Sequence, residues 1–187
     1  MKRFIFISSA IINLLFIISL ILCCVFGFSG AYIAIFITLL MFAYHIDVRL
    51  LIGLLGLTIF RKRVNVESKI FHVSDSDCKF LNVMKVKDWK DRYFAMERSQ
   101  FVITNFRDKD VLKRVLSYNI TAEVTHWLCL FFGAFAILIG CFISIDEWWI
   151  YLITTILAGL FCDVLPIMIQ RFNRYRLQKV YAKLKQF

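Results

Sequence analysis

Four long apolar runs, separated by polar residues, set the pattern of this chain. They cover about residues 4–28, 31–44, 123–145 and 148–169. A transmembrane helix needs about 20 consecutive apolar residues. The pattern therefore predicts about four membrane-spanning helices. A further apolar stretch, 50–60, is short for a span, and it is predicted as a re-entrant or interfacial helix or as the end of a long bent one.

The first apolar run allows two interpretations, because Met1-Lys2-Arg3 precede it as in a secretory signal peptide. A signal peptide has an apolar core of about 7–15 residues, followed by a cleavage site of small residues. This run is longer, and no clear site of that kind follows it. The pattern favours an uncleaved helix.

Residues 61–122 are polar and carry 14 Lys and Arg against 8 Asp and Glu. Alternating apolar and polar residues at 80–89 predict a strand or an amphipathic interfacial piece, whereas the spacing at 111–118 predicts a helix. The tail after residue 170 has six Lys and Arg and no acid. Its apolar residues recur at helical spacing, which predicts an amphipathic helix on the membrane surface; they are Leu177, Val180, Tyr181 and Leu184.

The predicted fold is an all-α integral membrane protein of about four transmembrane helices. A small cytoplasmic α/β-like segment lies between the second and third helices, and a basic amphipathic helix ends the chain. The predicted domains are an N-terminal membrane hairpin with a short interfacial or re-entrant segment, a basic cytoplasmic segment, a C-terminal membrane hairpin and a basic tail; they cover residues 1–60, 61–122, 123–169 and 170–187.

Composition supports a membrane location and limits the partners. Of the 187 residues, 60% are hydrophobic, above the about 45–50% usual in soluble domains. The net charge of +10 comes from basic residues that flank the apolar runs, so anionic lipid head groups are favoured over nucleic acid as partner. Positive charge concentrates at both ends and in 61–122, which places both termini in the cytoplasm by the positive-inside rule.

Several kinds of chemistry lack their sequence signals. The six cysteines include no CxxC pair, and five of them lie in apolar segments. The chain has no GxGxxG, Walker, HExxH or GxSxG motif. We therefore expect no metal and no bound cofactor.

Ionisable residues inside the apolar runs are the candidate catalytic groups. Each costs about 2.5–3.5 kcal/mol at the membrane centre, so such residues usually mark function. Glu123 and His126 share a helix face, where the carboxylate would orient the imidazole as a general base. Asp163 lies about two turns inside the fourth run. The alternatives are a helix-dipole role for Glu123, simple anchoring by His126, and an ion pair between Asp163 and an arginine of the bundle.

Three patches resemble one family of small bacterial membrane proteins, the glycosyl-4,4'-diaponeurosporenoate acyltransferases. They are Met84-Lys85-Val86-Lys87-Asp88-Trp89-Lys90-Asp91, Ala122-Glu123-Val124-Thr125-His126-Trp127 and Gln170-Arg171-Phe172-Asn173-Arg174-Tyr175-Arg176-Leu177. Order and spacing agree over about residues 71–185. The chain departs from the family pattern at four positions. Ser74 stands where the family carries a Glu, Tyr118 where it carries an acidic residue and Asp163 where it carries an Asn. The family's proline is displaced by one position, to Pro166.

The resemblance implies transfer of a fatty acyl chain onto a sugar hydroxyl of a glycosylated carotenoid or related glycolipid, at the cytoplasmic side of a bacterial plasma membrane. The donor would be an acyl-CoA or acyl-carrier thioester. Partners would be membrane lipid and the glycolipid, with a homo-oligomer or pathway enzymes as further candidates. The predicted catalytic residues are His126, Glu123 and Asp163. The predicted substrate-binding residues are Gln170, Arg171, Asn173, Arg174, Arg176, Lys87, Trp89 and Lys90.

Two alternatives stay open: an acyltransferase for a different polar lipid, and a non-catalytic membrane subunit of a lipid-synthesis complex. An enzyme needs Glu123, His126 and Asp163 to converge around one cavity. A scaffold would hold them as isolated pairs.

Overall fold

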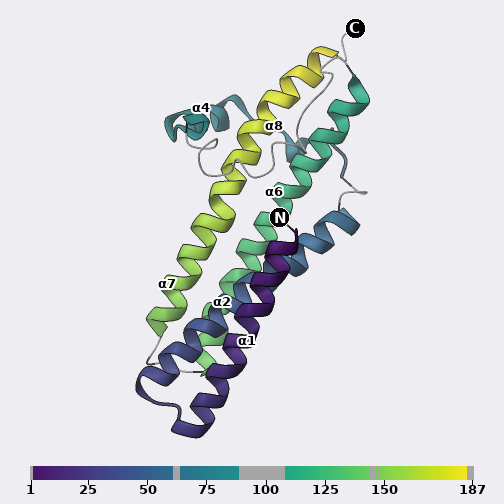
Figure 1. The fold of residues 1–187 in the computed structure, drawn as a ribbon. Helices are drawn as coiled ribbons and strands as arrows, with labels where there is room; N and C mark the ends of the chain where they lie inside the picture. The colour runs from purple at the N-terminus through teal and green to yellow at the C-terminus, as the bar shows by residue number, and fades with distance from the viewer. Residues whose placement is uncertain (1, 61–63, 89–107, 144–145, 147, 185–187) are drawn as a thin grey trace. The chain divides into compact units, whose positions relative to one another are not determined.

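The computed structural model describes residues 2–60, 64–88, 108–143, 146 and 148–184. Every regular element in these ranges is helical (Figure 1). In chain order they are α1 (Lys2–Phe26), α2 (Gly30–Leu55), the π-helix η1 (Gly56–Phe60), the 3-10 helix η2 (Lys69–Phe71), α4 (Asp75–Val83), α6 (Lys109–Ile143), α7 (Trp148–Gly159), the π-helix η4 (Leu160–Val164) and α8 (Leu165–Leu184).

Four helical stretches are long and apolar enough to cross a membrane: Phe6–Phe26, Gly30–Leu55, Lys109–Gly140 and Trp148–Leu184. The predicted number of spans is therefore confirmed by length and composition. The apolar stretch 50–60 is the end of α2 continued directly by η1, which matches one of the alternatives predicted for it.

Two predicted helix boundaries change. The helix predicted at 111–118 and the third span form a single helix, α6, and no proline or glycine interrupts the sequence that joins them. The fourth span continues through η4 into α8, well past residue 169. Pro166 does not stop this helix; it follows directly on the π-helix η4, a local irregularity of the kind that occurs inside α-helices.

The chain forms two compact units. Unit 1 consists of Met1–Leu54 and Trp127–Val164, and unit 2 consists of Leu55–His126 and Leu165–Phe187. The predicted division into four segments is a different partition and stays a prediction.

The core of unit 1 packs α1, α2, the end of α6 and α7 through small and apolar side chains. Tyr151 is fully buried and lies against Gly140, where a Cβ atom would collide with its ring. The turn between α1 and α2 uses Gly27 with φ 96° and Gly30 with φ 55°, a backbone region that glycine adopts without strain. Other members of this core are Cys23, Phe36, Ile37, Met41, Ala136 and Ile150.

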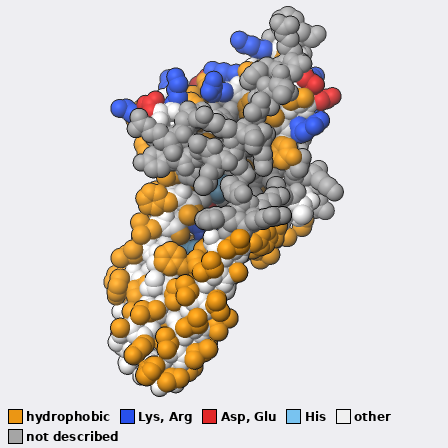
Figure 2. Space-filling model, viewed as in Figure 1, with side chains coloured by type: hydrophobic (Ala, Val, Ile, Leu, Met, Phe, Trp, Pro, Cys, Tyr) orange, Lys and Arg blue, Asp and Glu red, His pale blue; other side chains and the backbone are white. Residues whose placement is uncertain are grey.

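The outward side chains of unit 1 are also apolar. Figure 2 shows hydrophobic side chains covering the visible face of its helices. Exposed examples on α1 include Ile7, Ile11 and Leu14, each more than half exposed. An apolar surface on this scale is not stable in water and fits contact with lipid.

Unit 2 has two apolar clusters, and both use α8. The first joins α6 to α8 through Leu112, Leu116 and Tyr181. Partly buried Leu177, Val180 and Leu184 complete it, so the apolar stripe of the tail packs on α6. The predicted helix is confirmed, and its apolar stripe packs on α6. Its placement on the membrane surface stays a prediction.

The second cluster joins α4 to α8, and it corrects the strand predicted as one option at 80–89. Leu81 and Val86 are buried against Ile169 and Phe172, whereas Val83 is 77% exposed. A strand would have placed residues 81 and 83 on one face, but the helix separates them. The described part of 61–122 contains no strand, and residues 89–107 lie outside it.

Candidate active site

One face of α6 carries polar residues at helical spacing in unit 2. Asn119, Glu123 and His126 follow one another at intervals of four and three residues, which places them on one side of the helix. Asn119 and Glu123 are buried, and His126 is half-buried. Such buried polar side chains require polar partners, and α8 supplies them.

Glu123 lies between two arginines of α8. Its Oε1 accepts a hydrogen bond from Arg171 Nε at 3.1 Å, and its Oε2 lies 2.5 Å from Arg174 Nη1. Arg174 is 1% exposed and Glu123 4%. Burying one of these charges alone would cost several kcal/mol, so their mutual pairing makes the arrangement tolerable.

A second carboxylate joins Arg171 from α4. Asp77 Oδ1 lies 3.7 Å from Arg171 Nη1. Asp77 is held by a capping box, in which its own N–H donates to Ser74 Oγ while its Oδ2 accepts from Ser74 N–H, each at 3.1 Å. The Ser74 N–H, then the Ser74 hydroxyl and the charges of Arg171 and Arg174, hold the pKa of Asp77 below its usual value, although burial opposes them. The carboxylate is therefore ionised at neutral pH.

Next to this cluster, an amide pair connects the same two helices. Asn119 Nδ2 donates to Gln170 Oε1 at 2.5 Å. Asn119, Glu123, Gln170, Arg171 and Arg174 together form a polar seam along α6 and α8, which we call the α6–α8 seam.

The structure brings together many of the residues predicted for substrate and catalysis. Glu123, Gln170, Arg171 and Arg174 lie in the seam. His126 is on the same face of α6, but its predicted pairing with Glu123 stays a prediction, since the contacts shown for that carboxylate are with arginines.

The remaining predicted substrate-binding residues are not members of the seam as defined above. Asn173 on α8 is half-buried, while Arg176 on α8 and Lys87 after α4 are exposed. Trp89 and Lys90 lie outside the described residues.

Asp163 belongs to unit 1, where it is fully buried on η4 and forms an ion pair with Arg49 of α2. Arg49 also donates to Ala158 O at 3.1 Å and to His45 O at 2.8 Å. The His45 ring in turn contacts Thr155 Oγ1 at 3.2 Å. These contacts match the predicted alternative for Asp163, an ion pair within the bundle.

Three residues were not predicted as partners of the site residues. Asn119 pairs with Gln170, Asp77 with Arg171 and Arg49 with Asp163. Two had a detectable signal. Asn119 precedes Glu123 by one helical turn, and Ser74 with Asp77 has the spacing of a capping box. Nothing in the local sequence pairs Arg49 with Asp163, because 114 positions separate them.

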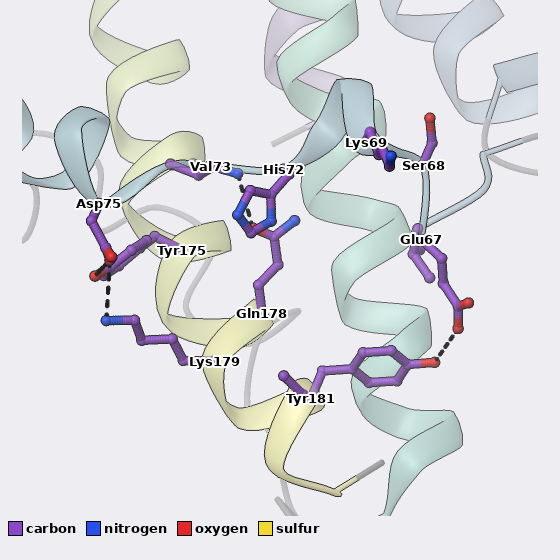
Figure 3. A pocket seen from close by; sticks show the side chains of 12 residues that line it. Glu67, Ser68, Lys69, His72, Val73, Asp75, Tyr175, Gln178, Lys179 and Tyr181 are labelled. Atoms are coloured by element: carbon purple, nitrogen blue, oxygen red, sulfur yellow. Dashed lines mark hydrogen bonds and ion pairs between the residues drawn. The ribbon is translucent and has the colours of Figure 1, made fainter. Parts of the chain in front are cut away.

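A groove of about 490 Å³ lies beside the seam in unit 2, between α8 and the segment around η2 (Figure 3). We call it the α8 groove. Its charged and polar lining includes Glu67, Lys69, His72, Asp75 and Lys179. Among the described residues, no three His, Cys, Asp or Glu side chains gather as metal ligands.

Comparison with known proteins identifies one family. The family model described as glycosyl-4,4'-diaponeurosporenoate acyltransferase matches residues 59–183. No curated protein and no solved structure matches the chain. The match covers about two thirds of the chain, including α4, α6, the α6–α8 seam and the α8 groove, so the protein belongs to the glycosyl-4,4'-diaponeurosporenoate acyltransferase family.

Proposed function

We propose that this protein transfers a fatty acyl chain from a thioester donor to a sugar hydroxyl of a glycosylated carotenoid or related glycolipid at the membrane. The observation that carries this proposal is that the family match includes the whole α6–α8 seam. The four apolar helices support a membrane location.

In the proposed reaction, His126 removes the proton of the sugar hydroxyl, and the oxygen attacks the thioester carbonyl carbon. The carbon–sulfur bond then breaks, the new ester forms, and the leaving thiolate takes the proton from the imidazolium. General-base help of this kind contributes about 10²–10⁴ in rate. His126 suits this role because it is half-buried, so it combines a defined position with access.

Arg171 is proposed to stabilise the oxyanion that develops on the carbonyl oxygen. Its side chain is 36% exposed, whereas that of Arg174 is only 2% exposed. Substrate can therefore reach Arg171, while the buried Arg174 pairs with Glu123 and holds that carboxylate in position. Glu123 accepts a hydrogen bond from Arg171 Nε and so orients the guanidinium group. A donor that is held in position in this way can stabilise the charge of a transition state.

The decisive experiment is mass spectrometry of pigment and lipid extracts from cells with and without the protein, with His126→Ala and His126→Gln as variants. We expect a species heavier by one acyl chain that disappears in both variants while the protein stays in the membrane. A correctly inserted His126→Ala protein with near-normal product would eliminate His126 as the base.

One observation favours a second candidate, a non-catalytic membrane subunit of a lipid-synthesis complex. Glu123 and Asp163 are each held by arginines of their own unit, as expected for isolated structural pairs. The same extracts separate the two candidates. A subunit would leave the acyl product unchanged in both His126 variants and lose it only when the protein is absent.

A further inference from the structure

The α8 groove has the size of a small-molecule site and no assigned occupant. Its volume of about 490 Å³ lies in the range of about 300–1,000 Å³ that is usual for such sites. Figure 3 shows its two walls, with Ser68, Lys69 and His72 on one side and Tyr175, Gln178 and Lys179 of α8 on the other.

The charges that line the groove are balanced. Two lysines, Lys69 and Lys179, are matched in number by two carboxylates, Glu67 and Asp75, and His72 also lines the groove. A site for a phosphate would be expected to carry an excess of positive charge. A balanced set of donors and acceptors instead suits a neutral ligand rich in hydroxyl groups, because each hydroxyl both donates and accepts.

Part of the lining is fixed by internal contacts. Gln178 accepts from Val73 N–H at 3.1 Å and donates to Phe71 O at 2.8 Å, which holds the two walls together. Asp75 accepts from the Tyr175 hydroxyl at 2.5 Å and lies 3.4 Å from Lys179 Nζ. The groove is therefore preformed, and its carboxylate Asp75 is held in place.

Other lining groups have hydrogen-bonding capacity to spare. Among the residues that the structure describes, the side chains of Ser68, Lys69 and His72 have no hydrogen-bond or ion-pair partner. A hydroxyl, an ammonium and an imidazole thus line one wall of the groove, where a ligand can use them.

The groove is connected to the α6–α8 seam. Arg171 and Tyr175 are one turn apart on α8, a rise of about 6 Å. Across from them, Asp77 contacts Arg171, while Asp75, two residues earlier on α4, contacts Tyr175. A ring held in the groove would therefore have one edge close to Arg171.

The geometry points to the α8 groove as the binding site for the sugar ring of the acceptor. In this assignment Lys69, His72 and Ser68 bind sugar hydroxyls from one wall. Asp75 accepts a hydrogen bond from a sugar hydroxyl at the other wall, and the reacting hydroxyl is directed toward Arg171. This inference rests on the proposed function, because it places the acceptor of that reaction.

The first test measures whether a sugar occupies the groove, independently of catalysis. Ser68→Cys places a thiol in the groove, and Ser76→Cys places one on the exposed, non-lining surface of α4. Alkylation of each cysteine is followed by mass spectrometry of the full-length protein in lipid nanodiscs. The probes are methyl glucoside, inorganic phosphate and adenosine 3′,5′-bisphosphate, the last carrying phosphates like those of a coenzyme A donor.

We expect methyl glucoside to slow alkylation at position 68 saturably, by about tenfold at ten times its dissociation constant, and to leave position 76 unchanged. Protection by either phosphate compound and not by the glucoside would overturn the assignment in favour of a donor-phosphate site. Protection by none of the probes would also overturn it.

The second test uses kinetics. Lys69→Met should raise KM for the glycolipid acceptor by about tenfold, the effect of one charge-assisted hydrogen bond, and leave KM for the thioester donor unchanged. The matched control is Lys113→Met, an exposed lysine of α6 outside the groove. An increase in donor KM instead would contradict the assignment while leaving the acyltransferase proposal intact. Absence of any transferase activity in the native protein would contradict the proposed function itself, whatever the alkylation result.

Discussion

At the scale of single residues, the pairing of Glu123 explains why buried charges persist on α6 and α8. The Glu123 carboxylate contacts the guanidinium groups of Arg171 and Arg174. Arg171 also lies near a second carboxylate, that of Asp77. Removal of one member of a buried pair costs about 3–5 kcal/mol, because the partner stays behind without its counter-charge. The seam should therefore respond to mutation as a unit.

We predict that Glu123→Gln lowers the free energy of unfolding by about 3–5 kcal/mol, since it leaves Arg174 buried beside a neutral amide. The double variant Glu123→Gln/Arg174→Met should recover much of this loss, because the second charge is gone as well. Denaturant unfolding of the purified protein in detergent measures both values and that of the single variant Arg174→Met. If the losses of the two single variants simply add in the double variant, the two residues are not coupled.

Asp163 allows a similar test in unit 1, where a structural and a catalytic role predict different results. Asp163→Asn should destabilise the protein because Arg49 loses its buried counter-ion. Replacing both residues, Arg49→Met with Asp163→Leu, should restore stability and leave acyl transfer in place. A stable double variant without transferase activity would instead support the predicted catalytic role of Asp163. Thermal unfolding and product analysis are made on the same preparation.

At the scale of elements, α4 is a short helix whose start is set by its cap. Ser74 and Asp77 satisfy each other's backbone N–H groups, and Leu81 then fixes the helix against α8. Helices of this length are marginal without such support. The position of Asp77 next to Arg171 therefore depends on the capping box.

We predict that Ser74→Ala costs about 1 kcal/mol of α4 stability, the usual value of an N-cap. Amide hydrogen exchange over Asp75–Val83 should become about fivefold faster. Ser76→Ala is the matched control, because Ser76 is exposed and outside the capping box. Equal exchange in both variants would show that the cap does not stabilise α4.

The lowered pKa of Asp77 predicts how α4 responds to acid. A carboxyl whose pKa is lower in the folded state contributes stability above its unfolded pKa of about 3.9, and this contribution is lost as pH falls through the folded value. Exchange protection of α4, corrected for intrinsic rates, should therefore be constant above about pH 5 and decline below pH 4. The pKa of Asp75, in the same turn, is also lowered, chiefly by the hydrogen bond from the Tyr175 hydroxyl. Asp77→Asn should therefore reduce this dependence without removing it, and an unchanged profile would exclude a contribution from Asp77.

The elements also show which features a sequence alone can predict. The helices followed from hydrophobic runs. Glu123, Arg171 and Arg174 were each predicted as site residues, and the structure pairs them. Of the two options predicted at 80–89, the strand is wrong for the described residues, because apolar alternation is ambiguous over so few positions, whereas the cap at Ser74 favours a helix. The partner of Asp163 could not be predicted, since helix packing chooses among several arginines distant in sequence.

At the scale of the whole molecule, the side of the membrane that each connection faces decides whether the proposed site can meet a cytoplasmic thioester donor. Residues 61–122 have a basic excess, and the connection at Asp146 has no basic residue. Because Lys and Arg are retained in the cytoplasm, the two segments should lie on opposite sides of the membrane.

We predict that Ser76→Cys in intact cells is protected from a membrane-impermeant maleimide until the membrane is permeabilised, whereas Asp146→Cys is labelled at once. Both positions are exposed in the structure, so access to reagent and not burial decides the result. Native cysteines are distinguished by identifying the labelled peptides by mass spectrometry. Immediate labelling of position 76 would place α4 and its Asp77 outside the cell. The donor would then have to be a lipid-borne acyl group, because acyl-CoA and acyl-carrier thioesters are confined to the cytoplasm.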